Sequence, residues 1–277
     1  MRIIAHLSDL HFGRIDAAIL PALGAALAAA GPDLLVISGD LTQRARTSEF
    51  RDARRFLNSL PYPRLVVPGN HDIPLYNMVS RWLDPFRRFR QYIDPELAPL
   101  FVDAEMAVAG VTTVRAGRLK NGRINLRQTS MIAGQLALAG PEATRIVVTH
   151  HPFDLPANAS PEDLIGRSRP AMAAFAESRV DMVLSGHLHG SLTSDSLVRY
   201  GRQHRQILLV QAGTATSTRH RCEENCFNII TLQHPLVTIS RMAWDAGAQY
   251  FKPAGSNVFC RKGNGWIREK PDGQEAI

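Results

Sequence analysis

The chain has 277 residues, of which 45% are hydrophobic and 21% charged, with a net charge of +7 and a sequence pI of about 9.8. This length and composition predict one large α/β domain or two small ones with a substantial core, and the chain contains no internal repeat or low-complexity segment. The positive charge favours anionic, phosphate-containing ligands. Nucleic acid is a less favoured alternative, because no recognisable binding motif is present.

Targeting and redox features predict a cytoplasmic protein. No run of about eighteen apolar residues is present, so no membrane span is expected. The N-terminus lacks the basic segment, apolar run and cleavage site of a secretory signal. The three cysteines, Cys222, Cys226 and Cys260, are an odd number in a large chain, and we expect free thiols rather than a disulfide scaffold.

The first expected strand covers residues 3–7 and ends just before Asp9 and His11. Because residues two apart on an extended chain point to the same side, this carboxylate and imidazole project together from the strand end. Such a pair could hold a divalent metal. Asp-x-His is common by chance, so the pair gains meaning only if the rest of the chain supplies partners.

The next elements predict a parallel sheet. Residues 17–30 are rich in Ala and Leu and predict a helix, which Gly-Pro ends. An apolar strand over 33–38 follows and leads into Gly39 and Asp40. A strand–helix–strand order implies a right-handed crossover between parallel strands. Ligands of such sheets bind beyond the carboxyl ends of the strands, where Asp40 lies.

A third polar cluster follows a third strand. Residues 47–60 predict an amphipathic helix and residues 64–67 a short strand, after which come Asn70, His71 and Asp72. Aromatic and arginine residues then alternate through residues 74–104. This segment is either an aromatic helix face packed on the core or a cap that shapes access to the site.

The rest of the chain supplies two further polar strand ends and a β-rich region. We expect strands at 106–114, 145–149 and 181–185, helices at 125–138 and 171–178, and antiparallel strands of a second sheet at 192–200, 207–212, 227–232 and 237–244. The second of these strands ends at His150 and His151, and the third at His187 and His189. Residues 1–250 are expected to form one domain, with a partly disordered tail at 251–277.

The strand ends form one pattern in order, and this pattern resembles the calcineurin-like metallophosphoesterase superfamily. Its parts are Asp-x-His at 9–11, Gly-Asp at 39–40, Gly-Asn-His-Asp at 69–72, His150, and Gly-His-x-His at 186–189. The segments at 121–124, 150–152 and 212–215 are similar to the class III cyclic-nucleotide phosphodiesterase branch. The resemblance implies an α/β/β/α sandwich, with two mixed β-sheets face to face and helices outside.

The resemblance also implies a binuclear metal centre. One ion would be held by Asp9, His11, Asp40 and His189, and the other by Asp40, Asn70, His150 and His187, so that Asp40 bridges them. His150 is favoured over His151 because it directly follows the strand. Nitrogen-rich ligation favours Mn, Fe or Zn over Mg alone. Two such ions clamp an in-line displacement at phosphorus and lower the pKa of a bound water, which implies attack by a metal-bridging hydroxide.

The resemblance gives His71 a role near the phosphate, with Asp72 orienting it. Arg219 and Arg221 lie in a loop rich in phosphate-binding groups and are candidate substrate residues; a solvated basic loop is the competing interpretation. Residues 41–44 lack the Asp-Arg-Gly run of Ser/Thr protein phosphatases, and His71 stands where lipid A precursor hydrolases usually carry Arg.

We therefore expect a metal-dependent phosphodiesterase acting on a small diester. Cyclic nucleotides are favoured as substrates, followed by glycerophosphodiesters and other small diesters, and a homodimer is a candidate assembly. A DNA-processing nuclease of the same superfamily is the first alternative. A non-catalytic scaffold on the same fold is the second, but such a scaffold should have lost ligands, whereas every expected ligand is present.

Overall fold

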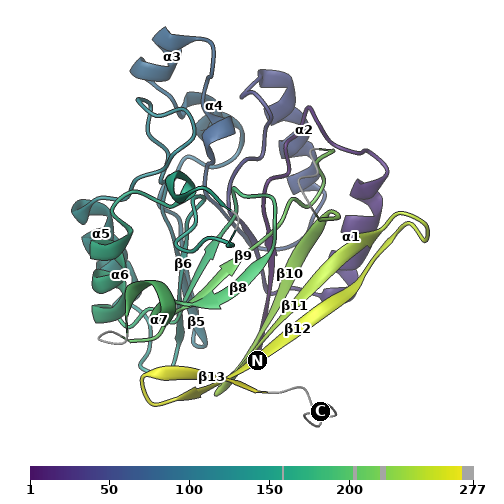
Figure 1. Ribbon diagram of the computed structural model, residues 1–277. Coiled ribbons are helices and arrows are strands. Elements are labelled where there is room, and N and C mark those ends of the chain that lie inside the picture. The colour runs from purple at the N-terminus through teal and green to yellow at the C-terminus, as the bar shows by residue number, and fades with distance from the viewer. Residues whose placement is uncertain (158, 202–204, 219–222, 270–277) are drawn as a thin grey trace.

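The computed structural model describes residues 1–277 apart from 158, 202–204, 219–222 and 270–277. Its architecture is two β-sheets with helices on their outer faces (Figure 1). None of the helices in the described part of the chain is long and apolar enough to cross a membrane.

The larger sheet has seven strands and joins the two ends of the chain. Strands β1, β2 and β3 are parallel to one another. Strand β10 pairs with β1, and from there to β13 each strand is antiparallel to its neighbour. In spatial order the strands are β13 (Gly265–Glu269), β12 (Tyr250–Lys262), β11 (Leu236–Asp245), β10 (Cys226–Gln233), β1 (Arg2–Leu7), β2 (Leu34–Ile37) and β3 (Arg64–Val66).

The smaller sheet has six strands, and its central four are parallel. Its two edge strands, β4 and β8, run antiparallel to their neighbours. In spatial order the strands are β4 (Leu100–Val102), β5 (Met106–Gly110), β6 (Thr144–Val148), β7 (Met182–Ser185), β9 (Leu208–Gln211) and β8 (Leu192–Asp195).

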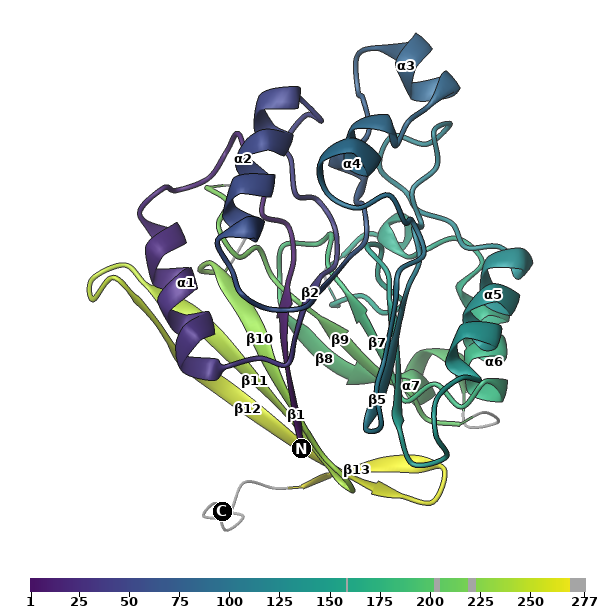
Figure 2. The ribbon, with the colours of Figure 1, turned by 180° about the vertical axis from the view of Figure 1, so that it is seen from behind.

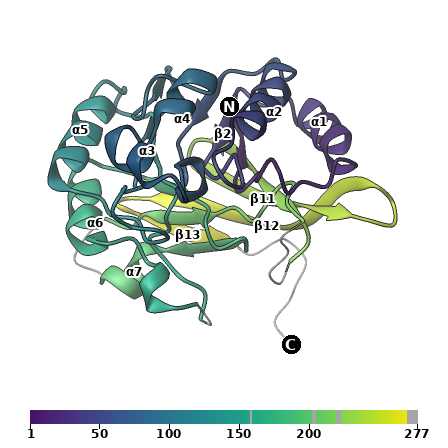
Figure 3. The same ribbon diagram turned by 90° about the horizontal axis from the view of Figure 1, so that it is seen from above.

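Alternation along the strands creates three cores and hence four layers. In β1, Ile4 packs between the two sheets, whereas Ala5 faces outward. Helices α1 (Ile19–Ala30) and α2 (Thr47–Asn58) cover the outer face of the larger sheet, and α5 (Leu126–Leu136) and α6 (Ser168–Glu177) cover that of the smaller one (Figures 2 and 3). The expected α/β/β/α sandwich of two mixed sheets is therefore confirmed.

The β-rich region differs from its expectation in three ways. Residues 192–200 are not one strand, because β8 ends at Asp195 and the short helix α7 (Ser196–Tyr200) follows. Strand β9 pairs in parallel with β7 in the smaller sheet, so the region is divided between both sheets. A sequence pattern reports the buried face of a strand but not its neighbour, which explains this error.

The expected tail from residue 251 is wrong as far as residue 269. Strand β12 continues β11 as a long antiparallel hairpin, and β13 pairs with the end of β12. Phe259 and Trp266 are buried in the core between the sheets, which fixes the position of these two strands. The polar and Pro-containing sequence reflects an exposed outer face rather than disorder. Residues 270–277 lie outside the described part of the chain.

The segment at 74–104 contains the two short helices α3 (Met78–Leu83) and α4 (Arg87–Tyr92). On α4, Phe89 is buried in the core on the outer face of the larger sheet, as expected for an aromatic helix face that packs on the core. On α3, by contrast, Trp82 is 63% exposed. Helix α3 projects at the top of the molecule (Figure 1), above the carboxyl ends of the strands. Only α4 therefore packs as a core helix.

Candidate metal centre

The strand-end polar residues meet at one edge of the sandwich. They follow β1, β2 and β3 in the larger sheet and β6 and β7 in the smaller one. The structure brings together the side chains of all seven residues that the sequence singled out as ligands: Asp9, His11, Asp40, Asn70, His150, His187 and His189. Carboxyl ends of parallel strands from two facing sheets thus supply one cluster.

The first group contains Asp9, His11, Asp40 and His189. The Nε2 atoms of His11 and His189 lie 3.0 Å apart, and Oδ1 of Asp9 lies 3.6 Å from the former and 3.4 Å from the latter. Oδ2 of Asp40 lies 3.8 Å from Nε2 of His11. Four ligand-type atoms therefore surround one point.

The second group contains Asp40, Asn70, His150 and His187. Nε2 of His150 lies 3.1 Å from Oδ1 of Asn70, 3.3 Å from Nδ1 of His187 and 3.5 Å from Oδ2 of Asp40. The same oxygen of Asp40 thus faces both groups. A single carboxylate oxygen lies between two sets of candidate ligands.

These distances fit metal ions. Ligand atoms about 2.0–2.2 Å from an ion, at angles of roughly 90–110°, lie about 2.8–3.6 Å from one another, and every distance above except the 3.8 Å from Asp40 to His11 falls within that range. The buried atoms Oδ1 of Asp9 and Nε2 of His187 have no hydrogen-bond partner among the described residues. Burying such atoms without a partner is costly, and an ion in the first group would satisfy the oxygen of Asp9.

Contacts behind the ligands fix their orientation. Oδ2 of Asp9 accepts hydrogen bonds from Ser8 Oγ (2.6 Å) and from the backbone amide of His187 (2.9 Å), which leaves Oδ1 facing the cluster. Nδ1 of His150 lies 2.8 Å from the carbonyl oxygen of Ser38, so Nδ1 carries a proton and Nε2 is the nitrogen that faces the cluster. These contacts present the oxygen and nitrogen that a metal would use.

The backbone of the cluster adopts an uncommon conformation. Five of the candidate ligands have positive φ angles: Asp9 (53°), His11 (51°), Asp40 (53°), His187 (79°) and His189 (61°). Positive φ is uncommon outside glycine, although Asp and His tolerate it better than most residues, and such strain gathers at functional sites. At Gly39 (φ 99°) a Cβ would lie 2.6 Å from Nδ1 of His150, so only glycine fits there.

The charge states suit metal binding. Burial opposes ionisation of Asp9, but contacts with His11 and His189 outweigh it and hold the pKa of that carboxyl well below its usual range. Burial lowers the pKa of His11 and that of His187, so both rings are neutral ligands. Burial also opposes protonation of His150, but Asp40 outweighs it and raises the pKa of His150 to about 9, so an ion would displace that proton.

His151 is adjacent to the cluster but is engaged elsewhere. Its Nδ1 lies 2.7 Å from Thr113 Oγ1, and its Nε2 lies 2.8 Å from the carbonyl oxygen of Lys120. A ring whose two nitrogens both have partners has no lone pair for an ion, although His151 lies near His150 and His187. The geometry therefore favours His150 over His151 as the ligand.

The expected orientation of His71 by Asp72 is wrong. Nδ1 of His71 instead lies 2.8 Å from the carbonyl oxygen of Gln43. The carboxylate of Asp72 is already occupied by the backbone amides of Gly69, Leu41 and Thr42 at 2.9, 3.1 and 2.8 Å, and by the Thr42 hydroxyl. Burial, followed by the charge of Asp40, raises the pKa of Asp72 to about 6. Asp72 thus ties together the two loops that carry Asp40 and Asn70.

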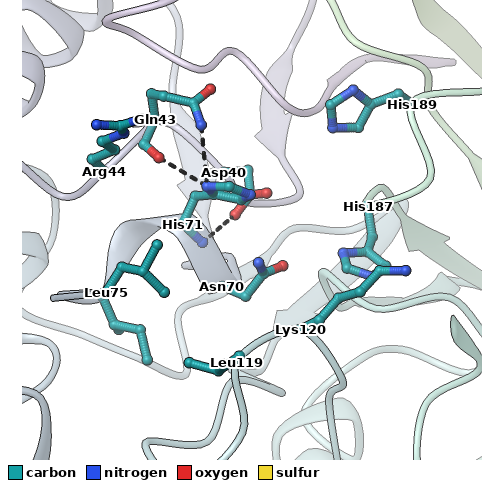
Figure 4. Close-up of a pocket in the computed structure, with 11 residues that line it drawn as sticks. Asp40, Gln43, Arg44, Asn70, His71, Leu75, Leu119, Lys120, His187 and His189 are labelled. Atoms are coloured by element: carbon teal, nitrogen blue, oxygen red, sulfur yellow. Dashed lines mark hydrogen bonds between the residues drawn. The ribbon is translucent and has the colours of Figure 1, made fainter. Parts of the chain in front are cut away.

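A pocket of about 230 Å³ opens onto the cluster (Figure 4). Sequence reasoning missed several of its residues, because a single leucine or glutamine carries no chemical signature. Besides Asp40, Asn70, His71, His187 and His189, its lining consists of Gln43, Arg44, Ile73, Leu75, Leu119 and Lys120. Arg219 and Arg221, the expected substrate residues, lie outside the described part of the chain.

Comparison with known proteins gives consistent matches. The family model described as calcineurin-like phosphoesterase matches residues 3–191. A glycerophosphodiester phosphodiesterase of Enterobacter lignolyticus is 29% identical over 212 residues, which cover 68% of this chain and 70% of that protein. A probable cyclic nucleotide phosphodiesterase of Vesicomyosocius okutanii subsp. Calyptogena okutanii is 23% identical over 160 residues, 57% of this chain and 62% of its own.

The fold also matches a solved structure. A purple acid phosphatase from yellow lupin (Lupinus luteus) seeds superposes with a TM-score of 0.70 at 12% identity, over 93% of this chain and 53% of that one. The present chain therefore spans about half the length of that protein. At this identity the likeness establishes the shared fold only.

Proposed function

The chain belongs to the calcineurin-like phosphoesterase family, and on that premise we propose that it is a phosphodiesterase that depends on two metal ions and cleaves a small diester. The observation that carries this proposal is Oδ2 of Asp40, which faces His11 at 3.8 Å and His150 at 3.5 Å. Two ligand groups that share one oxygen suit a pair of ions held close together.

In this proposal the first ion is held by Asp9, His11, Asp40 and His189, and the second by Asp40, Asn70, His150 and His187. The nitrogen-rich groups favour Mn, Fe or Zn. When bound, such ions would activate a water and neutralise charge on the phosphoryl oxygens. Because Asn70 is neutral, the two carboxylates leave a centre of two divalent ions with a net charge of about +2, which attracts a phosphate.

His71 is the proposed acid of the reaction. It lines the pocket, and its Nδ1 is engaged by the Gln43 carbonyl, so the ring is held with Nε2 as its remaining polar atom. In the protonated ring this atom donates a hydrogen bond and can pass its proton to the leaving oxygen. The role of Asp72 is positional, because it holds the loops on either side of this ring.

The substrate we propose is a small diester, with cyclic nucleotides favoured. The names of both curated relatives refer to diesters with small ester groups. The pocket of about 230 Å³ is slightly below the range of roughly 300–1,000 Å³ typical of small-molecule sites, so it accommodates one small ester group rather than a length of polymer. A nuclease, the alternative, would bind DNA with a strong salt dependence.

The test is metal-restored hydrolysis of two chromogenic esters. The protein is stripped of metal, supplied with Mn²⁺, and assayed with bis-p-nitrophenyl phosphate and with the monoester p-nitrophenyl phosphate. We expect the diester to be cleaved and the metal-free protein to be inactive. Cleavage of the monoester alone would overturn the diesterase proposal, and no metal-restored cleavage of either would overturn the proposed activity.

A further inference from the structure

Arg81 is the one fully buried side chain among the large side chains of α3. Its helix is otherwise open to solvent, with Val79 70% and Leu83 81% exposed. The guanidinium group donates three hydrogen bonds to backbone carbonyl oxygens: Nε to Ala116 (2.7 Å), Nη1 to Pro74 (2.8 Å) and Nη2 to Arg118 (2.5 Å). The side chain therefore joins the segment before α3 to the loop at 116–120.

This arginine has no carboxylate partner among the described residues. Burial lowers the pKa of Arg81, yet guanidinium stays charged in proteins, so the charge is balanced by carbonyl dipoles alone. Burying a charge in this way is costly, and only well-aligned hydrogen bonds such as these three offset the cost. The rigid fork of an arginine sets the spacing of the carbonyl oxygens that it contacts, which a lysine cannot do.

The carbonyls that Arg81 holds immediately precede two pocket residues. Pro74 is followed by Leu75, and Arg118 by Leu119. Both leucines line the pocket, at the lower left of Figure 4, across from His189 at the upper right. Leu119 is 62% exposed. A ligand in the pocket that contacts this side chain would remove its apolar surface from water. The two leucines form an apolar wall opposite the candidate ligands.

The loop at 116–120 is also held from its other side. The carbonyl oxygen of Lys120 lies 2.8 Å from Nε2 of His151, whose ring in turn packs against His150 and His187. Residues 116–120 form no regular helix or strand of their own. Its position relative to the metal-side histidines is therefore set by Arg81 on one side and by His151 on the other, and the ammonium of Lys120 also pairs with Asp163.

We propose that Leu75 and Leu119 form a subsite for a flat heteroaromatic group, the base of a nucleotide ester, and that Arg81 is its positioning residue. This inference rests on the proposed function. A base would cover both leucines, while the amide of Gln43 lines the same pocket and can meet its edges. A glycerol ester group would leave the apolar wall in water.

The test compares two ligands that differ only in the base: AMP and ribose 5-phosphate. Isothermal titration of the Mn²⁺-loaded protein measures both dissociation constants without turnover. We expect AMP to bind at least about tenfold more tightly, because the base removes apolar surface from water. Leu119 is exposed, so folding tolerates Leu119→Ser. In this variant the dissociation constant of ribose 5-phosphate divided by that of AMP should fall towards one.

Arg81→Lys separates a positioning role from a structural one. General destabilisation would weaken the binding of both ligands alike and leave the ratio of their dissociation constants unchanged. Displacement of the apolar wall would lower that ratio. The matched control is Arg87→Lys, an exposed arginine on α4, which should keep the wild-type ratio. Equal affinity of the wild-type protein for AMP and ribose 5-phosphate, or an unchanged ratio in Leu119→Ser, would overturn the subsite. Both results would leave the phosphodiesterase proposal standing, because hydrolysis of bis-p-nitrophenyl phosphate tests that separately.

Discussion

The backbone amide of His71 donates a hydrogen bond of 2.8 Å to Oδ1 of Asp40. This contact occupies one oxygen of the carboxylate and turns the other, Oδ2, towards both groups of candidate ligands. Because the donor is a backbone atom, the contact survives replacement of the His71 side chain. The imidazole and the amide of His71 therefore have separable functions.

His71→Ala should keep both metal ions but lower kcat by about 10²- to 10⁴-fold, the range expected for loss of a general acid. Metal content by mass spectrometry and kcat on bis-p-nitrophenyl phosphate measure the two effects. His234→Ala is the matched control, because that half-exposed histidine faces Glu142 far from the pocket. Loss of metal from His71→Ala would contradict the assignment.

Asp72→Ala should be destabilised by roughly 3 kcal/mol or more, because it leaves three buried backbone amides without an acceptor. Asp72→Asn keeps one acceptor oxygen and should lose less. Urea unfolding of the three proteins gives the free energies. A fully stable Asp72→Ala protein with the kinetic defect of His71→Ala would instead favour a direct action of Asp72 on that ring.

Replacement of the two adjacent histidines should have different effects. His150→Ala should lose one of two ions, because Nε2 of His150 lies within 3.5 Å of three other candidate ligand atoms. His151→Ala should keep two ions with metal affinity reduced by about 10- to 100-fold, as is typical when a supporting contact is lost. Titration of Mn²⁺ into each apoprotein measures both. Loss of an ion from His151→Ala alone would reverse the assignment.

Removal of metal should lower the thermal stability. A metal ion whose free concentration is 100 times its dissociation constant stabilises the native state by about 2.7 kcal/mol. For a protein of this size, that free energy corresponds to a rise in Tm of roughly 5 °C. Scanning calorimetry with EDTA and with added Mn²⁺ measures this shift. Asp40→Ala, which lacks the shared oxygen, is expected to show a much smaller shift; a full wild-type shift in that variant would count against the shared site.

Much of the site could be predicted because its residues carry chemical signatures and follow apolar strands. Asp9 and Asp40 lie at strand ends, and parallel topology brings such ends together whatever the sequence between them. The layers of the sandwich were expected from the resemblance to the family, whereas the patterns of apolar residues predicted only the individual strands and helices and their buried faces. The pairing of β9 with β7 was not predictable, since a buried strand can add to either sheet.

The remaining features depend on contacts between distant loops. Asp72 follows His71 in sequence, but its carboxylate turns to the amides of Leu41 and Thr42, about thirty residues earlier. Nothing in the sequence marks Leu119 as a pocket residue. It reaches the pocket because Arg81 holds the neighbouring carbonyl of Arg118. The positive φ angles of the candidate ligands are likewise imposed by the assembled cluster rather than by local preference.

The most direct test of the central claim is anomalous diffraction from crystals of the Mn²⁺-loaded protein, collected at the manganese edge. Two peaks about 3.5–4 Å apart are expected, with Oδ2 of Asp40 between them, one beside Asp9, His11 and His189 and the other beside Asn70, His150 and His187. A single peak, or two peaks that do not share Asp40, would contradict the account.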